Sequence, residues 1–178
     1  MPYSDVGNYT FDTYLDYVQQ GIYLWENSPY VKNYPELYFL NYVLFHRTND
    51  EEIKPCRTYF WKKIKDKVQG KAMVEAALEI NHWCAGEVMY QGTDMRTGSA
   101  LEIYRSGVGR CGEEAVFVVN VMRSAGIPAR PVYVPRWSHC DDNHAWVEVW
   151  CDGDWHYLGA CEPEAVLDKG WFTNAASR

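Results

Sequence analysis

The sequence lacks a basic cluster, and its 178 residues carry a net charge of −7. Nucleic-acid grooves are lined by clustered lysine and arginine, so we expect no nucleic-acid partner. No run of about 18 apolar residues occurs, which argues against a membrane-spanning helix. The amino terminus has neither the basic start nor the apolar run of a signal peptide. An aromatic content of 16% then favours a folded domain over a disordered segment.

Cysteine is present, but its spacings are irregular and no CxxC pattern occurs. The chain is larger than the domains that disulfides commonly staple, and a structural zinc site needs paired ligands that these spacings do not offer. We therefore expect most cysteines to be reduced and buried. This expectation favours a reducing compartment, with an exported parent protein as the alternative. The six residues are Cys56, Cys84, Cys111, Cys140, Cys151 and Cys161.

Apolar residues recur at helical spacing in the first half of the chain and alternate in the last third. We expect helices over residues 10–25, 36–45, 60–68 and 71–88. A fifth helix begins at about residue 111 and ends at Gly126, and a long connection rich in turn-forming residues precedes it. We expect strands over residues 129–134, 144–150 and 155–159. The last two are joined by Asp152-Gly153, a strong hairpin signal. Helices followed by a short antiparallel sheet make an α+β domain.

The segment "GRCGEEAVF" places a cysteine between glycines where the fifth helix should begin. Structural cysteines usually lie in apolar runs, and glycines are costly unless something must approach the backbone closely. The first turn of a helix has unpaired N–H groups and the positive end of the dipole, which favour the thiolate of Cys111. The thiolate is the nucleophilic form. Glu113 and Glu114 are ordinary stabilisers of a first helical turn.

A nucleophilic cysteine needs a base, and the base needs a group that orients it. His144 begins the segment "HAWVEVW", and Glu162 follows the last strand in "LGACEPE". A nucleophile at a helix start, with a base and a carboxylate on neighbouring strands, is the arrangement of Cys-His-acid catalysis. Each residue alone reads as an ordinary polar position. Their combination with the glycine-flanked Cys111 favours a catalytic site.

Four segments in order resemble the transglutaminase-like superfamily of cysteine enzymes. They are "GRCGEEA", "MRSAGIPARPVYV", "NHAWVEVW" and "WHYLGACEPE" followed by "GWF". "GRCGE" and "CEPE" are also similar to motifs of peptide N-glycanases, which belong to the same superfamily. The resemblance implies a papain/transglutaminase-like core with Cys111 as the nucleophile and His144 as the base. The third member is usually Asp followed by Pro, and Glu162-Pro163 takes that place here.

The resemblance also sets the expected organisation of the chain. We expect residues 1–70 to form a mostly helical extension and residues 71–178 to form the transglutaminase-like catalytic core. Many relatives continue into further domains, so the chain is either complete or a fragment of a longer protein. The expected partner is an amide-bearing protein or peptide substrate. No cofactor and no metal are expected, and the oligomeric state is left open.

The hairpin tests Glu162 independently of the resemblance. A two-residue turn at Asp152-Gly153 places His144 opposite Cys161 and points Glu162 to the other face. A longer loop or one bulge shifts the register by one residue and places Glu162 opposite His144. A direct contact between Glu162 and His144 therefore requires an irregular hairpin.

The loop over residues 138–144 concentrates potential metal ligands. It has no partner cluster elsewhere and no recognised ligand spacing, so a substrate-lining role is favoured over a metal site. The residues concerned are His139, Cys140, Asp141, Asp142 and His144.

The leading functional hypothesis is thiol-dependent acyl transfer, in which Cys111 attacks an amide carbonyl and His144 protonates the leaving amine. Water then gives hydrolysis, by a protease or amidase, and an amine gives transglutaminase cross-linking; hydrolysis is preferred. The alternatives are a binding module on an inactive transglutaminase-like scaffold and, further off, a metal-dependent hydrolase. An oxyanion hole needs the backbone N–H of Cys111 and one more donor, for which Tyr90 and Gln91 are candidates.

Overall fold

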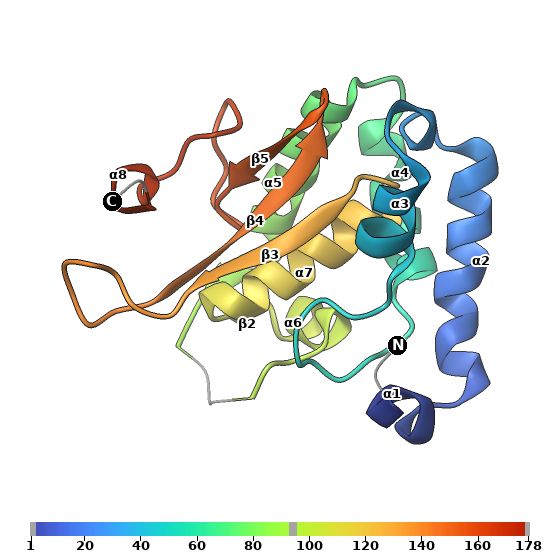
Figure 1. Ribbon diagram of the computed structural model, residues 1–178, viewed down its shortest axis with the longest axis horizontal. Coiled ribbons are helices and arrows are strands. Elements are labelled where there is room, and N and C mark those ends of the chain that lie inside the picture. The colour runs from blue at the N-terminus through green and yellow to red at the C-terminus, as the bar shows by residue number, and fades with distance from the viewer. Residues whose placement is uncertain (1–2, 93–95, 177–178) are drawn as a thin grey trace.

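The computed structural model describes residues 3–92 and 96–176, in which helices pack against a small antiparallel sheet (Figure 1). The helices are α1 (Tyr3–Asn8), α2 (Phe11–Asn27), α3 (Glu36–Phe39), α4 (Arg57–Val68), α5 (Met73–Glu87), α6 (Ala100–Ser106), α7 (Cys111–Ser124) and α8 (Thr173–Ala176), with a 3-10 turn η1 (Val31–Asn33) and a π-helical turn η2 (Leu40–Leu44). The strands are β1 (Met89–Tyr90), β2 (Val108–Gly109), β3 (Ala129–Val134), β4 (His144–Cys151) and β5 (Asp154–Leu158).

The predicted α+β class is confirmed, and most predicted elements are found with small shifts of their ends. The helices α2, α4, α5 and α7 correspond to four of the predicted helices, and the segment 36–45 forms α3 continued by η2. The three predicted strands form one antiparallel sheet in the order β3-β4-β5. Gly126 follows α7 with a φ of +85°, a left-handed conformation that glycine adopts easily.

The long connection before Cys111 contains structure that was not predicted. Ser99 caps α6, because its hydroxyl accepts from the backbone N–H of Glu102 at 3.4 Å and its own N–H donates to the carboxylate of Glu102 at 2.9 Å. Gly107, with a φ of +70°, ends the helix. The strand β2 then pairs in parallel with β1. The expectation of a connection without regular structure was therefore wrong, because a seven-residue helix gives too short a periodic signal to stand out.

The helix α7 is the centre of the molecule. Its residues from Glu113 to Ser124 are all buried. It contacts α4, α5, α6 and the strands β3 and β4. In Figure 1, α5 and α7 lie together behind the sheet. Because α7 is enclosed on every side, its first residue is held rigidly relative to the sheet.

One hydrophobic core joins the early and late parts of the chain. It includes Tyr17 and Leu24 of α2 as well as Val147 of β4 and Leu158 of β5. The division at residue 70 stays a prediction. Within residues 3–92 and 96–176, no helix is long and apolar enough to cross a membrane.

The six cysteines are all free, and their burial varies more than expected. Cys56, Cys84 and Cys151 are buried, Cys111 and Cys161 are partly exposed, and Cys140 is exposed.

Candidate active site

Cys111 is the first residue of α7, as the sequence predicted, and its side chain is partly exposed. The strand β2 ends just before the helix, and Arg110 connects the two in an extended conformation (φ −75°, ψ 167°). Gly109 allows a tight approach here, since a Cβ at this position would lie 3.1 Å from the Cβ of Glu113. The sulfur therefore belongs to the helix terminus whose unpaired N–H groups and dipole favour an anion.

The path of the chain brings His144 to the same end of α7. The strand β3 follows α7 after a short link and packs against it. A helix of 14 residues and a strand of 6 are both about 20 Å long. The end of β3 at Val134 therefore returns to the level of Cys111, and Val134 pairs with His144 in β4. Figure 1 shows the start of α7, the end of β3 and the start of β4 at one end of the sheet.

His144 is buried in an aromatic environment, with only 6% of the residue exposed. Its Nε2 is buried and has no hydrogen-bond partner in the described parts of the chain. Burial lowers the pKa of His144, and the charge of Asp142 opposes this shift. The ring is therefore neutral near pH 7 and can accept a proton. The surrounding rings, with their centroid distances from His144, are Trp171 at 4.6 Å, Phe172 at 5.0 Å, Trp146 at 6.1 Å and Trp137 at 6.3 Å.

Glu162 lies in the loop after β5, where its carboxylate meets Trp171. The indole Nε1 of Trp171 donates a hydrogen bond of 3.0 Å to Oε1 of Glu162. The other carboxylate oxygen, Oε2, is buried and has no partner among the described residues. Burial raises the pKa of Glu162, and the hydrogen bond from Trp171 partly offsets the increase. A pocket of about 280 Å³ opens beside this pair.

The predicted hydrogen bond between Glu162 and His144 is not formed, so that prediction was wrong for this structure. The hairpin is regular: Asp152 and Gly153 form a two-residue turn with φ of +53° and +95°, and Cys151 pairs with Asp154. The strand β5 ends at Leu158, so Glu162 has no place in the register at all. Instead, Glu162 and His144 share Trp171 as a neighbour.

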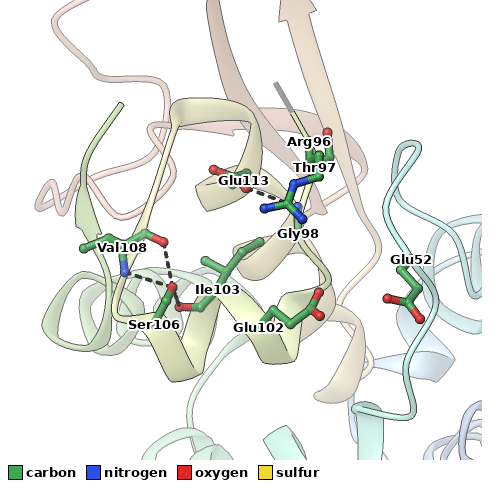
Figure 2. A pocket seen from close by; sticks show the side chains of 9 residues that line it. All are labelled: Glu52, Arg96, Thr97, Gly98, Glu102, Ile103, Ser106, Val108 and Glu113. Carbon is green, nitrogen blue, oxygen red and sulfur yellow. Dashed lines mark hydrogen bonds between the residues drawn. The ribbon is translucent and has the colours of Figure 1, made fainter. Parts of the chain in front are cut away.

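Glu113 has the structural role expected of a first-turn acid. Its carboxylate accepts hydrogen bonds from the backbone N–H of Arg110 at 3.0 Å and of Gly98 at 3.1 Å. It also lines a pocket of about 410 Å³ (Figure 2), and the three predicted catalytic residues are not among the residues that line this pocket. That pocket lies on the side of α7 that faces α6, so it is separate from the candidate active site. Its lining residues are Glu52, Arg96, Thr97, Gly98, Glu102, Ile103, Ser106, Val108 and Glu113.

Glu114 has a different environment from that of Glu113. It is 4% exposed, and it lies one helical turn after Cys111. Burial, together with the charges of Glu162 and Glu113, raises the pKa of Glu114 to about 8. The expectation of an ordinary first-turn stabiliser was therefore incomplete, because this carboxyl is mostly protonated near pH 7. Its presence beside Glu162 adds a second acidic side chain to the candidate active site.

The predicted oxyanion candidates lie near the nucleophile in the small β1–β2 sheet. The backbone N–H of Gln91 donates to the carbonyl of Gly109 at 2.9 Å. Tyr90 is the last residue of β1, and 68% of it is exposed. This pairing places both residues beside the segment that leads into Cys111. Which of them supplies the second donor stays a prediction.

The acidic loop before β4 has no metal cluster within the described ranges, where no three His, Cys, Asp or Glu side chains are placed to share an ion. Arg136 instead forms an ion pair with Asp141, at 2.7 Å. The ring of His139 lies 6.2 Å from that of Trp137.

Sequence reasoning missed two residues that determine the position of Glu162. Trp171 was given no role from the sequence, whereas its indole donates a hydrogen bond to the carboxylate. Asn81 of α5 was not considered, although its buried amide binds the loop that carries Glu162. The available signal was a polar side chain on the apolar side of a predicted helix.

Comparison with known proteins identifies the family of the chain. A family model described as the transglutaminase-like superfamily matches residues 62–160. A solved structure described as a "putative cysteine protease" from Cytophaga hutchinsonii is 24% identical, with a TM-score of 0.48. The match covers 60% of this chain and 36% of the other, so this chain spans about a third of that relative. No curated protein matches. Since the family match covers more than half of the sequence, the chain belongs to the transglutaminase-like superfamily.

Proposed function

We propose that this protein is a cysteine-dependent hydrolase of amide bonds, a protease or amidase, with Cys111 as the nucleophile and His144 as the general base. The observation that carries the proposal is the buried Nε2 of His144, which has no partner in the described chain. Buried polar atoms are nearly always satisfied, and exceptions occur where a group must exchange a proton. The fold supports the pairing, because it brings His144 to the end of α7 where Cys111 lies.

The proposed reaction has two halves. The Nε2 of His144 takes the thiol proton of Cys111, and the sulfur adds to the amide carbonyl carbon. The N–H groups at the start of α7 stabilise the negative charge that develops on the carbonyl oxygen. Collapse of this intermediate breaks the C–N bond, and the leaving amine takes the proton from His144. Water then gives a proton to His144 and attacks the thioester carbonyl. The C–S bond breaks, the acid leaves, and His144 returns the proton to the sulfur of Cys111.

Glu162 is the proposed third member of the site. Its carboxylate would accept a hydrogen bond from the imidazolium of His144 during the reaction. Support comes from their common neighbour Trp171, whose ring centroid is 4.6 Å from that of His144 and whose Nε1 is 3.0 Å from Glu162. A change in the side-chain rotamer of Glu162 would complete the triad, because its carboxylate would then accept a hydrogen bond from the imidazole of His144 in place of the one from the indole of Trp171.

The test uses denatured casein, which offers peptide bonds and glutamine amides together. A protease releases new α-amines, an amidase releases ammonia, and a transglutaminase incorporates dansylcadaverine. We expect one of the two hydrolytic products, with much less incorporation. In parallel, iodoacetamide should alkylate Cys111 much faster than the other five cysteines. Comparable rates at all six would overturn the nucleophile assignment.

An inactive binding module is the second candidate. The observation that favours it is the contact of Glu162 with Trp171 in the place of a contact with His144. A protein that labels slowly at Cys111, turns over no casein and nevertheless binds it would have this function.

A further inference from the structure

The loop after β5 is held by a side chain from a distant helix. Asn81 of α5 is 2% exposed. Its Nδ2 donates to the backbone carbonyls of Gly159 at 2.9 Å and Glu162 at 3.2 Å, and its Oδ1 accepts from the N–H of Cys161 at 3.0 Å. Three backbone groups within four residues therefore depend on one amide.

The loop has little else to determine its path. Its own backbone contributes one turn bond, from the N–H of Glu162 to the carbonyl of Gly159 at 3.1 Å. Cys161 lies in the left-handed region with a φ of +58°, which is unfavourable for a residue with a side chain. A conformation of this kind persists only when its surroundings impose it. The hydrogen bond that the N–H of Cys161 donates to Oδ1 of Asn81 provides that constraint.

The same loop determines where the carboxylate of Glu162 lies. The side chain folds back over Gly159, where an added Cβ would overlap Oε2 of Glu162. Its Oε1 meets the indole of Trp171. A shift of the loop backbone would therefore move the carboxylate relative to Trp171 and His144.

We propose that Asn81 is the positioning residue of Glu162: its amide holds the loop over residues 159–162 so that the carboxylate lies beside Trp171 and within reach of His144. This inference rests on the proposed function, in which Glu162 acts with His144. An asparagine suits the task because its amide both donates and accepts. An apolar residue would leave the carbonyl of Glu162 and the N–H of Cys161 without these partners, and it would remove one of the two hydrogen bonds to the carbonyl of Gly159.

The experiment compares Asn81→Ala with a matched control, Asn120→Ala. Asn120 of α7 is also 2% exposed. Its amide binds the carbonyl of Val116 and the hydroxyl of Thr48, and it accepts from the thiol of Cys56. Both substitutions should lower the free energy of unfolding by similar amounts. Only Asn81→Ala should lower kcat for casein, by about 10- to 100-fold with little change in KM, because misplacement of a supporting group affects the reaction more than binding.

A spectroscopic measurement reports on the loop without any need for turnover. The indole N–H of Trp171 donates to Glu162, so its proton resonance senses the carboxylate. The resonance is assigned by its loss in Trp171→Phe. It should shift in Asn81→Ala and in Glu162→Gln, and it should stay unchanged in Asn120→Ala.

The outcomes separate this inference from the proposed function. A shifted indole resonance in Asn81→Ala supports the positioning role even if the wild-type protein turns over nothing, in which case the proposed function alone fails. If the wild-type protein is active and Asn81→Ala leaves either the indole resonance of Trp171 or kcat unchanged, the positioning role is overturned. If Asn81→Ala does not fold, Asn81→Asp replaces it. This variant keeps the acceptor for the N–H of Cys161 and removes both donated bonds, and the same two outcomes decide.

Discussion

His46 and His144 are equally buried, each 6% exposed, but they differ in what their ring nitrogens meet. Both are surrounded by aromatic rings, and burial lowers the pKa of both. The Nε2 of His46 lies 3.0 Å from a carboxylate oxygen of Asp5, whereas the Nε2 of His144 has no partner in the described chain. The first histidine is therefore part of a satisfied structural network, and the second retains an atom available for chemistry.

Two carboxylates, Asp5 at the Nε2 of His46 and Glu162, which shares Trp171 as a neighbour with His144, differ in the same way. Asp5 accepts hydrogen bonds from Arg47 and His46, and the guanidinium of Arg47 is the main cause that lowers the pKa of Asp5 to about 2. Glu162 has one indole donor and an unsatisfied oxygen, and burial raises its pKa. Incomplete satisfaction of buried polar groups, rather than burial itself, distinguishes the candidate active site from the structural network.

The largest expected effect is on turnover after loss of His144. His144→Ala should lower kcat for casein by about 10⁴-fold or more, because the nucleophile loses its base. His46→Ala should leave kcat nearly unchanged and lower the melting temperature instead. Residues that act as a unit are non-additive, so Cys111→Ala combined with His144→Ala should be no slower than either alone. Loss of turnover in His46→Ala with an intact fold would contradict the distinction between a structural His46 and a catalytic His144.

The second prediction concerns the carboxylates. Glu162→Gln should keep the fold and lower kcat by ~10²–10⁴-fold, by analogy with other orienting carboxylates. Asp5→Asn is the matched control, and its kcat should equal that of the wild type. Steady-state rates on casein give both values. An unchanged rate in Glu162→Gln would remove Glu162 from the proposed triad and leave Cys111 and His144 in place.

The third prediction concerns stability at the structural network. Asp5→Asn should lower the free energy of unfolding at pH 7 by about 3 kcal/mol, because Arg47 and His46 lose their buried partner. The folded pKa of Asp5, about 2, lies below the unfolded value of 3.8. Its contribution is therefore present above about pH 4 and lost as the pH falls toward 2. Urea unfolding at pH 7 and pH 2.5 should show the difference between wild type and variant shrinking at the lower pH.

The fourth prediction, at Glu114, has the opposite pH dependence. The folded pKa of Glu114 is raised from 4.5 to about 8, so its contribution to stability is full below pH 4.5 and lost as the pH rises to 8. Glu114→Gln should therefore stabilise the protein by about 4 kcal/mol at pH 8.5 and by little at pH 4.5. Thermal unfolding at the two pH values measures this difference. Greater stabilisation at the acidic value would show that folding lowers the pKa of Glu114, opposite to the expected direction.

Local sequence signals predicted much of the framework. The periodicity of the apolar residues gave four of the helices, and the glycines around Cys111 marked the start of α7. Asp152-Gly153 indicated a two-residue turn, and the structure has one. The short helix α6 was missed. Its stability comes from burial of Leu101 and Ile103 and from a cap, and neither stands out in seven residues.

The sequence by itself determined that a glycine-flanked cysteine begins a helix and that a turn at Asp152-Gly153 joins two strands, because both depend on neighbours within a few positions. Only the tertiary structure decided where Glu162 lies. The strand β5 ends before it, so the register of the hairpin does not reach it. Its loop is held instead by Asn81, about 80 residues earlier, and its carboxylate by Trp171. Such contacts form only after distant segments have packed together, and no local pattern encodes them.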